Sequence, residues 1–378
     1  MKHNILHILP LIGLMAISVA AKAQVNFEPV FSQMRLEARA DFDYNHSSDE
    51  FGSDFTDLYG MHGRYFNLIV GGDLGDKFSY FFRQRIVANP GNVSLFDNTD
   101  FLYINYMPNA NWMIRMGKDA LAVGGFEYDA PPIDVLFCTR YWDYFYCFQP
   151  ALAAAYKSNN GKHMILGQIG NSPYVHNDGG AQWNDGLFSY NLFYSGDFGH
   201  YKMLSSVNWF QRPDRKFMNY IAIGQKLVYD KFDIYLDLIH HAMATNDWGN
   251  NYAVVSCANW YVNKNLSFFA KGSWEQNFSS NALGNYWLTN PGMFDCFAEE
   301  DHSYCTYGLG MEFHPASCPD FRFHAYVANR TTVDNTPLLE IANYSMNNLM
   351  VNCGVTWNMD INRMWKDRLA RINSTMNK

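Results

Sequence analysis

Residues 32–44, SQMRLEARADFDY, carry the pattern that decides the fold. Apolar or small side chains occupy the even positions from Met34 to Tyr44, and charged side chains occupy the odd positions from Arg35 to Asp43. Because side chains alternate across a β-strand, this segment has one apolar and one charged face. A soluble sandwich would bury the apolar face in a shared core. A membrane barrel would turn the apolar face toward lipid and line a pore with the charged face.

The same alternation recurs along the chain, and the connections between the strands are alternately short turns and long polar loops. The short turns are expected at residues 75–77, 108–111, 158–161, 196–199, 230–231, 263–265 and 315–320. The long loops are expected at residues 45–62, 88–98, 119–148, 170–186, 211–217, 243–250, 276–302 and 331–346. One strand on each side of every connection gives about 16 strands, each near the roughly 10 residues that cross an outer membrane. Short periplasmic turns and long extracellular loops are typical of outer-membrane barrels.

Aromatic residues flank most of the short turns, for example Tyr106 and Trp112, Tyr194 and Tyr201, and Tyr229. Around a closed barrel these residues would form one ring at one height, where lipid headgroups meet hydrocarbon. Aromatic residues make up 17% of the chain, a background at which such recurrence by chance is rare. The pattern therefore predicts an all-β fold, a transmembrane antiparallel up-and-down β-barrel.

The faces of the strands predict a water-filled interior. In the last strand, alternate residues from Leu349 to Ile361 are apolar, and the residues between them are mostly polar. At about 16 strands the interior of a barrel is too wide for side chains to fill, so an aqueous channel is expected. Four residues do not fit this division: Phe81 and Phe269 fall on the lumen face, whereas Ser205 and Gln225 fall on the lipid face.

The ends of the chain differ from its centre. Residues 1–23 combine a basic start, an apolar run and the triplet Ala21-Lys22-Ala23, which together are typical of a secretory signal peptide. Pro10 and Gly13 interrupt the run, which disfavours a membrane anchor. Residues 24–365 are expected to form the barrel, and residues 366–378 a polar C-terminal tail. No later segment approaches the roughly 20 apolar residues of a spanning helix.

The formal net charge of −8 argues against nucleic acid as a partner and leaves the lipid bilayer as the expected one. No cofactor and no metal are expected. Adjacent His240 and His241 point to opposite faces of a strand and cannot easily share one ion.

The longest loop, residues 119–148, follows the fifth strand. Gly124-Gly125 allow a sharp bend and Pro131-Pro132 stiffen the path. A loop of this length that folds into the lumen would narrow the pore. Its acidic residues are the candidates for the constriction: Asp119, Glu127, Asp129 and Asp134.

The run RMGKDALAVGGFEYDAPPIDV, residues 115–135, together with the strand layout, resembles the phosphate-selective porin O and P family. The resemblance implies a 16-stranded, usually trimeric porin of the Gram-negative outer membrane, in which the loop after strand five forms the constriction. It also implies passive diffusion of small hydrophilic solutes or ions. Phosphate selectivity in that family rests on basic pore residues, whereas this loop is acidic, so phosphate is not carried over as the substrate.

Several basic residues are expected on the lumen face, where closure of the barrel would gather them into one basic wall. They are Arg35, Arg39, Arg83, Arg85, Arg115, Arg322 and Arg330. If the acidic loop lies opposite this wall, a transverse field crosses the constriction and selects ions. The alternative is that these arginines only neutralise Glu37, Asp41 and the loop acids.

Two other functions and two disulfides stay open at this stage. An outer-membrane barrel enzyme, of the lipase or protease type, is the alternative from another class, although the chain has no Gly-x-Ser-x-Gly and no His-Glu-x-x-His motif. A closed, surface-binding barrel is the third alternative. Cys138 and Cys147 bracket one loop segment, Cys296 and Cys305 bracket another, and each pair is a candidate for a local disulfide.

Overall fold

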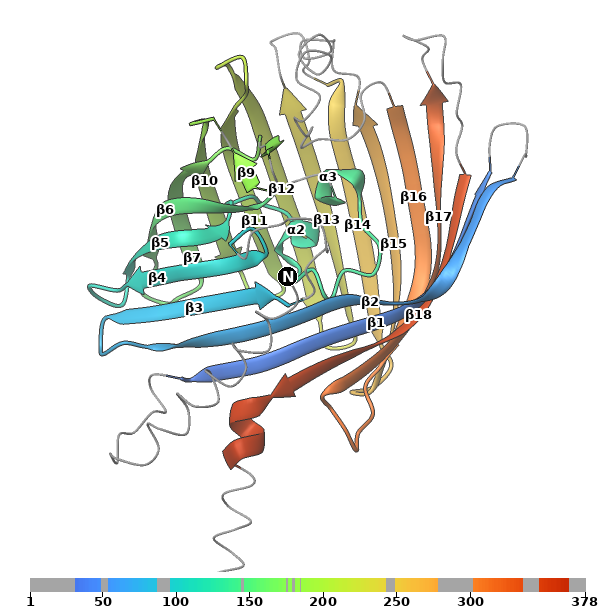
Figure 1. Ribbon diagram of the computed structural model, residues 1–378, viewed down its shortest axis with the longest axis horizontal. Coiled ribbons are helices and arrows are strands. Elements are labelled where there is room, and N and C mark those ends of the chain that lie inside the picture. Colours follow the sequence, from blue (N-terminus) through green and yellow to red (C-terminus); the bar gives the residue numbers. More distant parts are fainter. Residues whose placement is uncertain are drawn as a thin grey trace, which may run out of the picture.

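The computed structural model describes residues 31–48, 54–86, 96–143, 146–174, 176–178, 181–183, 185–242, 249–277, 302–335 and 347–366. Sixteen of the described strands close into one antiparallel barrel, as the sequence predicts, and Figure 1 shows them side by side around the ring. No helix in the described ranges is long and apolar enough to cross a bilayer. The predicted signal peptide and most of the C-terminal tail lie outside the described residues.

The strands follow the chain, with each strand pairing with its neighbours in sequence. The first seven are β1 (Gln33–Ser48), β2 (Asp54–Asp73), β3 (Phe78–Arg85), β4 (Thr99–Tyr106), β5 (Trp112–Ala120), β6 (Phe148–Lys157) and β7 (His163–Asn171). The next six are β10 (Phe188–Asp197), β11 (Tyr201–Gln211), β12 (Phe217–Tyr229), β13 (Phe232–Ala242), β14 (Asn251–Tyr261) and β15 (Leu266–Asn277). The last three are β16 (His302–Phe313), β17 (Phe321–Asn335) and β18 (Asn347–Asp360), and β18 closes the ring against β1.

The long connection after β5 holds two short helices, α2 (Phe126–Asp129) and α3 (Arg140–Asp143), which Figure 1 shows within the ring of strands. A small hairpin, β8 (His176–Asp178) and β9 (Ala181–Trp183), lies in the connection between β7 and β10. All seven predicted short turns join consecutive strands at the expected positions.

Two predicted loops are partly strand. The loop expected at residues 45–62 is a continuation of the first hairpin, because β1 runs to Ser48 and β2 begins at Asp54. Asn45 pairs with Leu58, and Ser47 pairs with Thr56. Backbone hydrogen bonds can extend a hairpin whatever the polarity of its side chains, so polar residues such as Asn45 and Ser47 do not mark the end of the strand. In the same way, β17 continues to Asn335.

The apolar face points outward. Met116, Leu152 and Ile165 are 68%, 52% and 54% exposed on the outer surface, whereas inward residues such as Gln168 and Asn208 are buried. The aromatic flanks of the short turns meet across neighbouring strands: Phe78 contacts Tyr106, Trp112 contacts Tyr156 and Tyr229 contacts Phe232. The predicted aromatic ring is therefore present on the outer surface.

Candidate functional site

The loop after β5, residues 121–147, runs along the inner wall of the barrel. Its first residues are fastened to β7 and β11: the Ala122 N–H donates to Gln168 Oε1 at 2.8 Å, and the Gly124 N–H donates to Ser206 Oγ at 2.8 Å. Asn208 Nδ2 donates to the Ala122 carbonyl at 2.9 Å. These donors and acceptors are inward side chains of the strands, so the loop lies inside the barrel.

The two glycines of this loop let its backbone touch the wall. A Cβ added at Gly124 would lie 2.8 Å from the carbonyl oxygen of Leu204, closer than side chains normally approach. Gly125 has a φ of 102°, which favours glycine, and it forms the N-cap of α2. The predicted bend at Gly124-Gly125 is confirmed, and it is combined with a close approach to the wall.

Two carboxylates of the wall cap the helical turns of the loop. Asp237 on β13 accepts hydrogen bonds from the backbone N–H groups of Phe126 and Glu127, both at 2.8 Å. Glu275 on β15 accepts from the N–H of Arg140 at 2.6 Å. Free N–H groups at the start of a helical turn attract carboxylates. The sequence analysis did not single out these two residues, because an inward acid on a strand looks the same whether it faces water or a loop.

Glu127 is buried between the loop and the wall and does not face the pore. Its carboxylate pairs with Lys271 Nζ at 2.7 Å and accepts from Thr139 Oγ1 at 2.6 Å. Lys271 also donates to the carbonyl of Phe137 at 2.6 Å. Phe137 packs on Tyr326 and on Phe269, which explains why the latter ring points inward. The candidate Glu127 is therefore a loop anchor.

Three of the seven predicted arginines hold the far part of the loop. Arg39 donates to the carbonyls of Ile133 and Val135 at 3.2 and 2.8 Å, and Arg330 donates to the carbonyl of Cys138 at 2.6 Å. Arg322 pairs with Asp134 at 2.7 Å and also bonds the Ile133 carbonyl. The loop acid Asp134 therefore lies against this stretch of wall and not opposite it.

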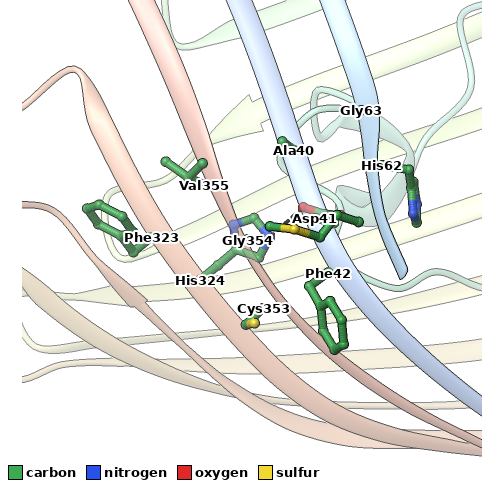
Figure 2. Close-up of a pocket in the computed structure, with 11 residues that line it drawn as sticks. Ala40, Asp41, Phe42, His62, Gly63, Phe323, His324, Cys353, Gly354 and Val355 are labelled. Carbon is green, nitrogen blue, oxygen red and sulfur yellow. Dashed lines mark hydrogen bonds and ion pairs between the residues drawn. The ribbon is translucent and has the colours of Figure 1, made fainter. Parts of the chain in front are cut away.

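A cluster of charged side chains lies at the seam where β1 meets β18, and it includes Arg39, which also binds the loop (Figure 2). Asp41 is buried and accepts from Arg39 Nη2 at 2.8 Å and from Arg64 Nε at 3.2 Å. His324 Nε2 lies 3.0 Å from its other oxygen. Figure 2 shows Asp41 and His324 meeting beside Gly354, where a Cβ would overlap both side chains. Glycine is required here for close packing.

The other predicted arginines face the inner side of β1, β3 and β5. Arg83 and Arg85 share Asp100, at 2.9 Å each, and Arg115 pairs with Asp119 at 2.8 Å, so the candidate acid Asp119 is a partner within the wall. Arg85 is the more exposed of the first two, with 40% of its side chain accessible against 9% for Arg83. Arg35 shares the inner face of β1 with Arg39 and is half-buried.

Arg64 is a lumen residue that sequence reasoning missed. Arg39 pairs with Tyr65 while Ala40 pairs with Gly63, so Arg64 is the extra residue of a β-bulge. The bulge shifts the alternation of β2 by one residue, which hides Arg64 from any period-two reading. Its side chain is 41% exposed, and it pairs with Asp41 and Asp43. His62, before the bulge, also contacts Asp43, at 2.9 Å.

The remaining loop acids are accessible. Asp129, at the end of α2, is exposed, and the side chain of Asp134 is 39% exposed even though it pairs with Arg322. The inner surface therefore divides into two regions. The loop-covered side includes β7, β11, β13, β15, β17 and β1, whose side chains bond the loop. Among the described residues, the open side consists of β2–β5, where cationic groups are exposed above buried carboxylates.

The expected disulfide between Cys138 and Cys147 is absent, because both are free thiols. Cys138 Sγ donates to Asp143 Oδ1 at 3.2 Å, and burial raises the pKa of the Cys147 thiol to about 12. Cys296 lies outside the described residues, so its pairing with Cys305 is not described. Within the described ranges, no three His, Cys, Asp or Glu side chains are grouped to hold a metal ion.

The family model for the phosphate-selective porins O and P matches residues 33–198. No curated protein matches the chain.

Among solved structures, the barrel is similar to the outer membrane channel DcaP of Acinetobacter baumannii, with a TM-score of 0.60 and 12% identity, over 86% of this chain and 96% of that one. It is also similar to an anion-selective porin from Comamonas acidovorans, with a TM-score of 0.54 and 12% identity, over 86% and 98% of the two chains. OprB of Pseudomonas putida gives a TM-score of 0.56 at 10% identity, over 86% and 94%. At 10–12% sequence identity these similarities show a shared fold. The chain therefore has the fold of a porin barrel, and its residues 33–198 match the phosphate-selective porin O and P family.

Proposed function

We propose that the protein is a passive diffusion channel for small hydrophilic solutes or ions. The observation that carries this conclusion is a closed 16-strand barrel with charged side chains on its inner face and an apolar outer face. A barrel of this size encloses an aqueous space. The family match over residues 33–198 supports the same function.

The two regions of the inner surface carry charges of opposite sign along the path of the solute. The loop is bound to β7, β11, β13, β15, β17 and β1, so solutes pass between the loop and the open side. On the open side Arg64 and Arg85 reach the lumen, while Asp129 and Asp134 are the accessible acids of the loop. We infer a transverse field between these two sets of charges, and charge arrays of this kind select ions in channels. The open-side set keeps Arg85 of the predicted wall and adds Arg64, whereas Arg39, Arg322 and Arg330 of that wall are bound to the loop.

The conclusion is tested by inserting purified protein into planar bilayers. Stepwise ohmic currents on the order of a nanosiemens or somewhat less are expected from a wide aqueous barrel. A channel with its interior closed, the surface-binding alternative, would give no current over many insertions. That result would contradict the proposed function.

The proposal also assigns no enzymatic activity to the barrel. Transport by diffusion requires no reacting group, and the inner carboxylates Asp237 and Glu275 are occupied by backbone N–H groups of the loop. Turnover of an ester or peptide substrate by the purified channel would overturn this part.

Two further parts of the proposal follow from the sequence and the resemblance. Residues 1–23 are removed as a signal peptide, which the mass of the mature chain tests. The assembled channel is a homotrimer, as the resemblance implies. Chemical cross-linking in the membrane is expected to give three bands, and a monomer at every cross-linker concentration would contradict the trimer.

A further inference from the structure

Two aromatic rings that alternation places on the inner face have different surroundings. Phe269 packs against Phe137 of the loop, with ring centroids 6.2 Å apart, and so belongs to the loop anchor. Phe81 makes its ring contacts with the wall: it stacks on Tyr103 at 5.6 Å and meets Phe101 edge-on at 5.6 Å. Loop packing thus explains the inward ring of Phe269, whereas the Phe81 ring packs on rings of the neighbouring strand β4.

The strand register places the Phe81 ring in a row of four paired residues that begins and ends with glycine. Gly71 on β2 lies opposite Phe81, Phe81 lies opposite Tyr103, and Tyr103 lies opposite Gly117 on β5. Two adjacent rings on the inner wall are therefore flanked on each side by a position without a side chain. The Phe81 ring lies within 3.3 Å of where a Cβ of Gly71 would be. We call Phe81, Phe101 and Tyr103 the aromatic shelf.

Guanidinium groups lie over two rings of the aromatic shelf, and Phe148 of β6 contacts Phe101 and lies beneath Arg83 and Arg85. Arg115 Cζ lies 4.1 Å from the Tyr103 ring centroid, and Arg83 Cζ lies 4.6 Å from that of Phe101. Such contacts hold cations beside aromatic faces. Arg85 is bound to the same carboxylate as Arg83, so three guanidiniums share two carboxylates here, Asp100 and Asp119.

The local net charge is therefore positive. The cationic side chains are also more exposed than the carboxylates. The side chains of Arg85 and Arg115 are 40% and 22% exposed, whereas those of Asp100 and Asp119 are 4% and 9% exposed. A solute at the shelf meets cations before it meets carboxylates.

We propose that the aromatic shelf is a binding site for aromatic carboxylates passing through the channel. The inference rests on the proposed diffusion function and names the solute class for one wall of it. The flat ring of such a solute packs against the Phe81 ring of the aromatic shelf, and its carboxylate meets Arg85 or Arg115. An aliphatic carboxylate of equal charge lacks the stacking contact, and a neutral ring lacks the charge.

The test is a titration of chloride current through the intact channel in planar bilayers. Benzoate is expected to reduce the current at a lower concentration than either of two control solutes. Acetate has the same charge without the ring, and benzyl alcohol has the ring without the charge. Phe81→Leu is expected to raise the half-inhibiting benzoate concentration about fivefold, the effect of losing one aromatic contact. Phe82 is the next residue of the same strand and lies on the outer face. Phe82→Leu is therefore the matched control, and it is expected to leave the half-inhibiting benzoate concentration unchanged.

The outcomes separate the inference from the function on which it rests. Equal effects of benzoate and acetate, or an unchanged benzoate effect in Phe81→Leu, overturn the aromatic site while chloride conduction stands. Stronger inhibition by glucose than by benzoate overturns it in favour of a sugar site. An absence of chloride current in the wild-type protein overturns the proposed function itself. If Phe81→Leu fails to fold, Arg85→Gln serves instead: a higher half-inhibiting concentration of benzoate with that of benzyl alcohol unchanged supports the site, and an unchanged benzoate effect overturns it.

Discussion

The loop-covered side and the open side of the barrel use the same residue types in different ways. On the covered side, Arg39 is only 2% exposed, and it bonds Asp41 and two loop carbonyls. On the open side, Arg64 and Arg85 also pair with buried carboxylates, yet about two fifths of each side chain reaches the lumen. An arginine on the inner face of a porin barrel is thus a structural tie or a solute contact according to what packs on it.

The largest expected effect concerns Gly354, at the seam between the two sides. Gly354→Ala places a methyl group against the buried Asp41 and His324, so these side chains must separate and the ion pairs of Asp41 with Arg39 and Arg64 must rearrange. Disrupting a buried charge pair costs about 3–5 kcal/mol, and we expect little folded barrel. Heat-modified mobility in electrophoresis measures the folded fraction. Gly63→Ala is the matched control, because a Cβ there meets open space on the outer side of the same seam. Equal yields for the two variants would contradict this account of the seam.

The next effect concerns Lys271, which holds the loop to the covered side. Lys271→Met leaves the buried Glu127 without its cation, a loss of about 3–5 kcal/mol that we expect to loosen the loop while the barrel remains closed. Faster proteolytic cleavage within residues 121–147 and noisier channel currents are the measurements. The double variant Lys271→Met with Glu127→Gln is expected to restore part of the protection, since no charge is left unpaired. Wild-type cleavage in the single variant would show that the loop does not depend on this ion pair.

A smaller effect distinguishes the two sides by their charges. Arg64→Gln removes an exposed cation, and a unit charge about 8 Å away in a water-like medium contributes about 0.5 kcal/mol, or about twofold in ion occupancy. We expect the reversal potential in a salt gradient to shift toward cation preference by a corresponding amount. Arg330→Gln, on the covered side, is expected to shift it less, because Arg330 is bound to the loop. Equal shifts would remove the distinction between the sides.

The smallest effect concerns the thiols of the loop. Burial raises the pKa of Cys147 to about 12, so this thiol stays protonated at pH 8 and is expected to react slowly with iodoacetamide in the folded barrel. After unfolding without reductant, Cys138 and Cys147 are both expected to become labelled, since they are not bridged. Mass spectrometry of the loop peptide measures both stages. Failure to label either cysteine after unfolding would indicate a disulfide and contradict the structure.

The sequence by itself determined the barrel, because period-two alternation and the placement of turns are local properties. The stretch from Met34 to Tyr44 already separates the two faces, and the seven short turns lie where the sequence places them. The bend at Gly124-Gly125 was visible for the same reason, since glycine permits the backbone angle that Gly125 adopts.

Only the tertiary structure decided which inner residues meet solutes. Arg39, Arg322 and Arg330 satisfy the same alternation rule as Arg85, and their difference arises from the loop that runs along the inner wall and binds them. Arg64 escaped the rule because a single extra residue in β2 shifts every later side chain of that strand to the opposite face. Alternation reports the face of a strand, whereas contacts between residues distant in sequence decide whether that face is covered.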